Sequence, residues 1–148
     1  MKKALSLFFC ILTVAGFLCT PAFATGNVVS FDDAYVEIYN ADGYPAVMTR
    51  TALSAHTLPA YGAMQYFSAG GERFRLADGQ RVQVSASLGT NATLQIGYND
   101  GSGTTYVQTV TGRSVSASFS VPSEGRYSIV IKNLSSYPVS VLSGEIRY

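Results

Sequence analysis

The feature that most constrains this chain is a regular alternation of apolar and polar residues, which begins near residue 64 and continues to the end. Successive side chains of a β-strand point to opposite faces, so alternation places the apolar residues on one buried face. Turn residues interrupt the pattern about every 8 to 12 residues, which is typical of an antiparallel sandwich or barrel. The residues expected to face inward are Val82, Val84, Leu94, Ile96, Val115, Phe119, Val121, Tyr127, Ile129 and Ile131.

This pattern predicts an all-β, antiparallel, jelly-roll-like β-sandwich of about eight strands. In the last strand the inward face changes from odd to even residue numbers, so we expect a β-bulge near Gly144. We expect strands at 74–76, 82–88, 92–98, 104–111, 115–121, 127–131 and from Val139 onward. We expect turns at 78–79, which joins the strand at 74–76 to the next one, and at 89–91, 99–103, 112–113, 122–125 and 133–138.

The segment between residues 25 and 63 carries a weaker pattern. Residues 35–39 have strand composition, with Val36 and Ile38 on one face, and 40–43 form a turn. We expect 46–53 to pair back with this strand and 54–63 to form a loop or crossover.

The N-terminus has the three parts of a bacterial secretory signal. Two lysines precede an apolar run over 4–18, and Ala22 and Ala24 form a small-x-small cleavage site. The apolar run is shorter than the about 20 residues of a membrane anchor. A lipoprotein signal would need small residues before Cys19, where the chain has Phe17 and Leu18. We therefore predict a signal peptide at 1–24, one domain at 25–148, no transmembrane anchor after cleavage, and secretion to the periplasm or the extracellular space.

Removal of this segment changes the chemistry available to the mature chain. Both cysteines, Cys10 and Cys19, lie in it, so no disulfide, cysteine-ligated metal or thiol nucleophile is expected. The remaining charges are nearly balanced and the basic residues are scattered, which argues against nucleic acid as a partner.

Residues 119–136, FSVPSEGRYSIVIKNLSS, contain a tight turn followed by a strand of the form G-x-Y-x-I-x-I-x-N. The segment resembles the closing hairpin of bacterial secreted β-sandwich modules, such as jelly-roll carbohydrate-binding domains and pre-peptidase C-terminal domains. The resemblance implies a sandwich with a binding or accessory role. It transfers no functional residue to this chain.

The sequence offers two kinds of candidate catalytic group. The single histidine, His56, has no G-x-S-x-G nucleophile motif to serve, and we expect it to be a solvated loop residue. Asp32 and Asp33 are the one adjacent pair of carboxylates, and we expect them to serve a turn and the edge of a strand. No catalytic residue is predicted.

Two binding constellations remain. Asn99 and Asp100 are the candidate calcium ligands, because they place oxygen atoms on a glycine-containing loop; the alternative is an ordinary hairpin turn, and no other cofactor is expected. Exposed tyrosine rings can stack on sugars or contact a protein, and Tyr35, Tyr39, Tyr44 and Tyr106 are the candidate binding residues. The alternative is that such rings only cap the rims of the sandwich. The tyrosines without a core assignment are Tyr35, Tyr39, Tyr44, Tyr61, Tyr66, Tyr106 and Tyr137.

The absence of a nucleophile-base pair in the sequence favours a secreted, non-catalytic binding or interaction domain for a carbohydrate or a cell-surface protein. The alternative is a small secreted hydrolase or effector whose site the sequence does not reveal.

Overall fold

The computed structural model describes residues 26–49 and 56–148. The predicted signal peptide, 1–24, lies outside the described residues, as does the segment 50–55, which includes the end of the predicted strand 46–53. The regular elements of the described part are all strands, and no helix there is long and apolar enough to span a membrane. The predicted all-β class is therefore confirmed.

The described residues form ten strands, rather than about eight. All pairs are antiparallel. The strands are β1 (Val28–Ser30), β2 (Tyr35–Tyr39), β3 (Pro45–Thr49), β4 (His56–Leu58), β5 (Ala63–Phe67), β6 (Phe74–Leu76), β7 (Arg81–Asn99), β8 (Thr104–Ser120), β9 (Gly125–Asn133) and β10 (Val139–Arg147).

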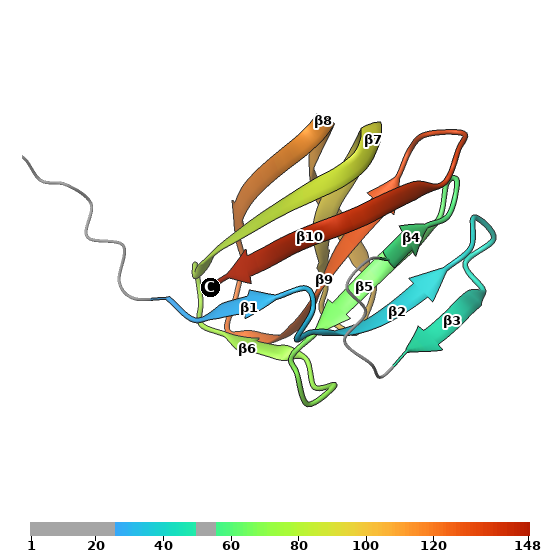
Figure 1. Cartoon of the computed structure of the whole chain (residues 1–148). Coiled ribbons are helices and arrows are strands. Elements are labelled where there is room, and N and C mark those ends of the chain that lie inside the picture. The colour runs from blue at the N-terminus through green and yellow to red at the C-terminus, as the bar shows by residue number, and fades with distance from the viewer. Residues whose placement is uncertain (1–25, 50–55) are drawn as a thin grey trace, which may run out of the picture.

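One sheet curls into two layers because β7 and β8 are long and bent (Figure 1). Residues 81–88 of β7 pair with β10 and with 114–120 of β8, whereas residues 92–99 pair with β9 and with 104–112 of β8. The first layer thus contains β1, β4, β10 and the first of these β7–β8 pairs. The second layer contains the other β7–β8 pair and then β9, β5, β2 and β3, while β6 pairs with the start of β9.

Segments 89–91 and 112–113 were predicted to be turns that reverse the chain, and this is wrong. Both segments remain in strand and bend, so each pair of predicted strands is a single strand that passes from one layer to the other. The β7–β8 register shifts between Ser87 and Ala92, at this bend. Strands commonly change sheets at such irregular corners of a sandwich.

Other connections also differ from expectation. The 78–79 turn is present, but β6 pairs with β9 instead of forming a hairpin with β7. The predicted loop 54–63 contains the short strand β4 and the first residue of β5. The bulge expected near Gly144 is confirmed by a register shift between Val141 and Ser143.

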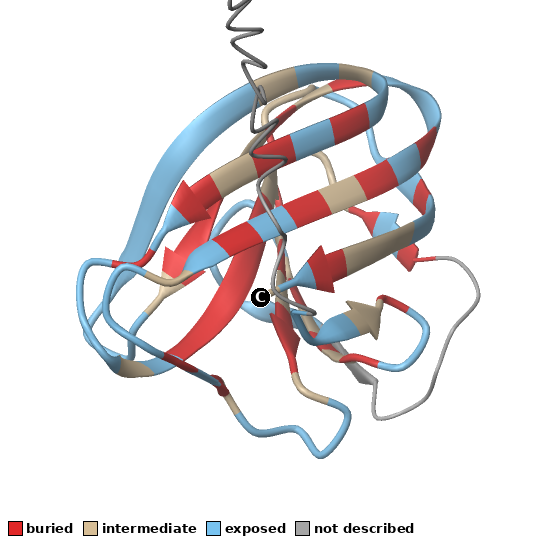
Figure 2. Ribbon diagram, turned by 90° about the vertical axis from the view of Figure 1, so that its left-hand side faces the viewer, coloured by how far each residue is buried: buried red, intermediate tan, exposed pale blue. Residues whose placement is uncertain are grey.

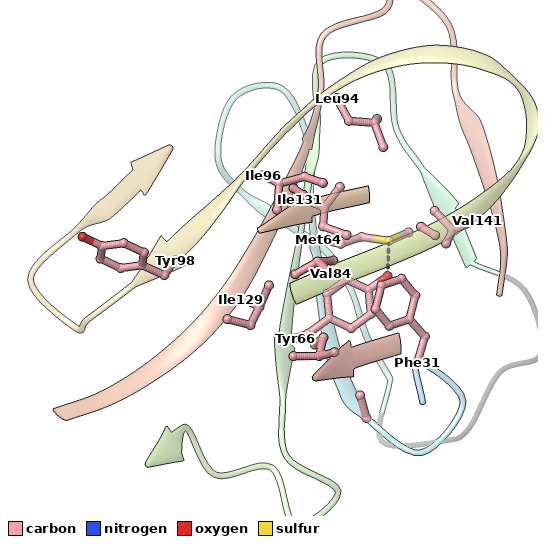
Figure 3. Packing of buried hydrophobic residues seen from close by; sticks show 14 of the residues in the cluster. Phe31, Met64, Tyr66, Val84, Leu94, Ile96, Tyr98, Ile129, Ile131 and Val141 are labelled. Atoms are coloured by element: carbon pink, nitrogen blue, oxygen red, sulfur yellow. Dashed lines mark hydrogen bonds between the residues drawn. The ribbon is translucent and has the colours of Figure 1, made fainter. Parts of the chain in front are cut away.

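The core lies between the two layers, and the whole set of residues predicted to face inward is buried. Figure 2 shows the alternation of buried and exposed residues along the strands. Rings from the two layers meet where Tyr98 and Phe119 lie 5.8 Å apart, centroid to centroid. Tyr66, which had no core assignment, is fully buried: it stacks on Phe31 at 4.2 Å, and its hydroxyl donates to Met64 Sδ at 3.4 Å (Figure 3).

Candidate binding face

The outer face of the second layer can be traced strand by strand from the register. Glu37 of β2 lies beside Gln65 of β5, which lies beside Val130 of β9. Val130 lies beside Gly97 of β7, and Gly97 lies beside Tyr106 of β8. Paired residues of neighbouring strands share a face, so this row crosses the layer from β2 to β8.

Tyr35 and Tyr39 lie two residues on either side of Glu37 and therefore point to the same face. Three of the four predicted binding tyrosines, Tyr35, Tyr39 and Tyr106, are thus brought together by strands far apart in the sequence. We call this surface the tyrosine face. Its two ends, on β2 and β8, are separated by four strand spacings, or about 19 Å.

The β2 end of the tyrosine face is held by contacts between its own side chains. The Tyr35 ring meets the Phe67 ring edge-on at 5.6 Å. The Tyr39 hydroxyl donates to Glu37 Oε2 at 2.5 Å. Partial burial, together with this hydrogen bond and the charge of the Glu37 carboxylate, raises the pKa of Tyr39 to about 12. Tyr39 is therefore a neutral ring with a fixed hydroxyl at any physiological pH.

The β8 end depends on a bulge. Ile96 pairs with Gln108, but the next residue, Gly97, pairs with Tyr106, so Val107 is the extra residue. Without this shift Val107 would occupy the place of Tyr106 in the row. A Cβ atom on Gly97 would meet the Thr105 carbonyl oxygen and would lie 2.8 Å from the Tyr106 Cα, so only glycine allows this approach.

Tyr106 also has a cationic neighbour. The Lys132 Nζ atom lies 5.7 Å from the centroid of the Tyr106 ring, within the range of a cation–π contact. Burial raises the pKa of Tyr106, which is 37% exposed. The ring is therefore neutral, supported on one side and still accessible.

Polar side chains lie between the two aromatic ends. Gln65 Nε2 donates to Ser128 Oγ at 2.6 Å, which fixes the amide across the β5–β9 pair. Lys132 lies beside Gln95 of β7, and both are half-buried. Val130, which lies in the same row between Gln65 and Gly97, is buried. The face therefore offers aromatic platforms at its ends and amide and ammonium groups between them.

The other exposed tyrosines do not belong to this face. Tyr44, the fourth predicted binding residue, is 72% exposed in the turn between β2 and β3. Tyr61 lies in the β4–β5 connection, and the Tyr137 hydroxyl donates to the Asn91 carbonyl at 2.6 Å. The row partners Gln65, Gln95 and Lys132 were not predicted, because the sequence alone does not reveal which strands are neighbours.

The candidate calcium ligands lie in the β7–β8 hairpin. Asn99 Oδ1 accepts from the Gly101 amide at 2.8 Å. Asp100 Oδ1 accepts from the Ser102 amide at 2.8 Å, the Ser102 hydroxyl at 2.7 Å and the Gly103 amide at 3.2 Å. These hydrogen bonds lower the pKa of Asp100, and the bond from the Ser102 hydroxyl has the largest effect. Within the described ranges, no cluster of three or more histidine, cysteine or acidic residues forms around a common point.

His56 was predicted to be a solvated loop residue, and this is wrong. It lies in β4 opposite Val141 of β10 and is only 4% exposed. Neither imidazole nitrogen has a hydrogen-bond partner among the described residues, and burial lowers the His56 pKa. A histidine in this position is not an accessible general base. Asp32 and Asp33 are exposed in the turn before β2, as expected.

Comparison with known proteins extends to the fold only. No protein-family model matches the sequence, and no curated protein matches it. The structure is similar to the C-terminal CBM6 of LamC, a marine laminarinase from Zobellia galactanivorans (11% identity, 82% of this chain and 100% of that one, TM-score 0.46). It is also similar to a carbohydrate-binding module of Cellvibrio mixtus lichenase 5A in complex with cellotriose (10%, 84% and 98%, 0.48). A third similar structure is the N-terminal cellulose-binding domain of Cellulomonas fimi β-1,4-glucanase C (17%, 83% and 91%, 0.44).

Proposed function

We propose that this protein is a secreted, non-catalytic binding domain and that the tyrosine face is its binding surface. The observation that carries the proposal is the convergence of Tyr35, Tyr39 and Tyr106 on one face of the second layer. Aromatic rings with a polar tip supply contact area at low entropic cost and are favoured at binding surfaces. A bulge and a glycine at the Gly97–Tyr106 pair are needed to place one of these rings.

The ligand class that fits this face is an extended, neutral carbohydrate. Sugar rings present apolar C–H faces, which stack on aromatic rings, and hydroxyl groups, which pair with amides. The face supplies both, with tyrosines at its ends and Gln65 and Gln95 between them. One ammonium, Lys132, and one carboxylate, Glu37, leave it without a dominant charge. The separation of about 19 Å between the ends suits a chain of several sugar rings.

The proposed site of action rests on the predicted signal peptide. Export of residues 25–148 would place the tyrosine face in the periplasm or outside the cell, where polysaccharides are the accessible polymers. Mass analysis of the exported protein should find Thr25 at its N-terminus. An exported form that begins at Met1, or that carries an acylated Cys19, would contradict this part of the proposal.

Affinity electrophoresis on a panel of neutral polysaccharides tests the binding function. At least one polysaccharide should retard the protein, and Tyr39→Ala or Tyr106→Ala should weaken that binding about tenfold, as loss of an aromatic anchor commonly does. Tyr39→Phe keeps the ring and should bind nearly as well. Leu142→Ala is the control, because Leu142 is 48% exposed in β10, which belongs to the first layer.

The outcome that would overturn the proposal is polysaccharide binding that survives the double change Tyr39→Ala and Tyr106→Ala in a protein that still gives a β-sheet circular dichroism spectrum. If no polysaccharide binds, but a surface protein is captured and its capture depends on Tyr39 and Tyr106, the tyrosine face is still the binding surface. Its ligand is then a protein rather than a carbohydrate.

A further inference from the structure

Tyr61 has a backbone conformation that tyrosine rarely adopts. Its φ angle is 55°, and it is the one residue other than glycine with a positive φ among residues 26–49 and 56–148. It is the third residue of the turn 59–62, in which the Gly62 amide donates to the Pro59 carbonyl at 3.0 Å. Glycine or asparagine usually occupies this place in a turn when φ is positive, because a Cβ atom is strained there.

Hydrogen bonds from β9 and from the connection that follows it hold this turn in place. The Tyr61 amide donates to the Ser135 carbonyl at 3.2 Å. Asn133, which is fully buried, donates from Nδ2 to the Pro59 carbonyl at 3.0 Å, and its backbone amide donates to the Gly62 carbonyl at 2.9 Å. A strained residue persists only when the structure around it fixes its conformation in this way.

The Tyr61 side chain contributes little to the fold. It is 51% exposed. In the described part of the chain, the tyrosine hydroxyls that form hydrogen bonds are those of Tyr39, Tyr66, Tyr127 and Tyr137, and Tyr61 takes part in none of the ring pairs. Its contacts within the fold therefore do not offset the strain. Backbone strain of this kind clusters at sites that hold a ligand.

Tyr61 adjoins the Tyr39 end of the tyrosine face. Ala63 of β5 lies beside Tyr39 on one side and beside Lys132 of β9 on the other. Tyr61 precedes Ala63 by two residues, so their Cα atoms are at most about 7 Å apart. A Cβ atom on Gly62, between them, would lie 2.5 Å from the Tyr39 carbonyl oxygen, so only glycine lets the turn approach β2 this closely. Tyr61 is therefore outside the rows that define the tyrosine face but next to one of them.

The other end of β2 is less accessible. The Tyr35 ring has Phe67 edge-on at 5.6 Å. The backbone of Gly71 lies against the same ring, since a Cβ atom there would be 3.8 Å from it. Tyr35 is half-buried as a result, whereas Tyr61 is 51% exposed. Of the two directions in which a ligand could leave the face along β2, the direction toward Tyr61 is the more open.

We propose that Tyr61 is a further stacking platform for the carbohydrate, and that the ligand runs from Tyr106 past Lys132 to Tyr39 and then to Tyr61. This inference rests on the proposed function of the tyrosine face and adds the direction of the ligand to it. A ring whose backbone is already fixed loses little conformational freedom when a ligand binds, which favours affinity. The strained turn is the device that holds the ring at the end of the face.

Affinity electrophoresis and thermal melts of three variants test this contact, on protein purified after expression of the full chain. The probes are hydroxyethyl cellulose, mixed-linkage β-glucan, galactomannan and pullulan, which are neutral. Tyr61→Ala and Tyr61→Gly should both weaken binding about tenfold, whereas Tyr61→Phe keeps the ring and should bind nearly as well. Tyr61→Gly should melt about 3 °C above Tyr61→Ala, because only glycine is unstrained at this φ. The more stable variant would then still lack affinity, so unfolding would not explain the loss.

Leu142→Ala, on the first layer, is the control and should bind like the unmodified protein. Binding that is lost in Tyr106→Ala but unchanged in Tyr61→Ala would overturn the contact and leave the proposed function in place. A larger loss from Tyr35→Ala than from Tyr61→Ala, in protein that still gives a β-sheet circular dichroism spectrum, would overturn the direction of the ligand. If none of the probes retards the unmodified protein, the carbohydrate ligand is wrong and this contact with it.

Discussion

The two outer faces of the sandwich are built on the same two long strands, yet they carry different side chains. On the first layer, the outward residues of β7 and β8 are mostly serines; on the second layer, the same strands contribute Gln95, Gly97 and Tyr106. Along β7, buried residues alternate with more exposed ones over most of its length in both layers. The alternation therefore determines the core and leaves every second residue available for other roles. The first-layer serines are Ser85, Ser87, Ser114, Ser116, Ser118 and Ser120.

The first layer does contain a hollow, of about 380 Å³, but its chemistry differs from that of the tyrosine face. Serine hydroxyls from β1, β7, β8 and β10 line it, and no aromatic ring is among the described residues that do. Its one carboxylate, Glu145, already forms an ion pair with Arg147 at 2.7 Å. Small hydroxyls of this kind hold water well but offer no platform for stacking. This is why we place binding on the second layer.

The largest expected effect concerns the shared core under these faces. Phe119→Ala should lower the free energy of unfolding by about 3 to 5 kcal/mol, through lost transfer energy and a cavity. Phe119 is 6% exposed and contacts the Tyr98 ring from the other layer. Ser120→Ala, one residue further and outward, should change stability by no more than about 0.5 kcal/mol. Urea denaturation of the two variants measures both values.

Comparable losses for the two variants would contradict the division into a buried and a solvated side of β8. Ser118→Ala provides a second outward control, since Ser118 Oγ accepts from Arg81 Nε at 2.7 Å in an exposed position. Its effect should also stay within about 0.5 kcal/mol.

The buried side of the strands that carry the alternation, such as residues 82–88 and 115–121, could be predicted from the sequence because it depends on local periodicity alone. The bends could not. Segments 89–91 and 112–113 have the glycine and polar composition of a turn, and whether such a segment reverses or only bends depends on what the strand beyond it pairs with. His56 was misassigned for the same reason: its burial comes from pairing with β10, some 85 residues later in the chain.

The tyrosine face could be predicted only in part. Tyr35, Tyr39 and Tyr106 were identified because they lacked a place in the core. That they share a face follows from the strand order β2-β5-β9-β7 and from the bulge at Val107, and neither is visible in local periodicity. Tyr44 satisfied the same sequence criterion but lies in a turn.

The two layers also differ in what they bury, which predicts a pH effect on stability. The first layer buries His56, whose pKa is lowered by desolvation below its ordinary value of 6.5, with Asp32 opposing the shift. Below about pH 6.5 the unfolded chain therefore binds more protons than the folded one, so the free energy of unfolding should fall as the pH decreases through this range. The second layer buries Tyr66, whose raised pKa keeps it neutral there.

Urea denaturation between about pH 5.5 and 7.5 measures this effect above the range in which most carboxylates titrate. His56→Phe, which replaces the imidazole by an apolar ring, should remove most of the pH dependence in that interval. A slope that is unchanged in His56→Phe, or stability that rises toward acid in the unmodified protein, would contradict the assignment.

The smallest expected effect concerns calcium at the tip of the β7–β8 hairpin. A calcium ion bound there would be a further difference between the two layers. We expect the melting temperature to be the same in calcium and in a chelator, because Asp100 Oδ1 already accepts three hydrogen bonds from its own loop. An ion that binds the folded chain would raise the melting temperature in proportion to its saturation. Thermal melts with calcium, with a chelator, and with Asp100→Asn in both conditions decide the matter. A calcium-dependent increase that disappears in Asp100→Asn would show that the loop exchanges its internal hydrogen bonds for an ion, and Asn99 would then be the next ligand to test.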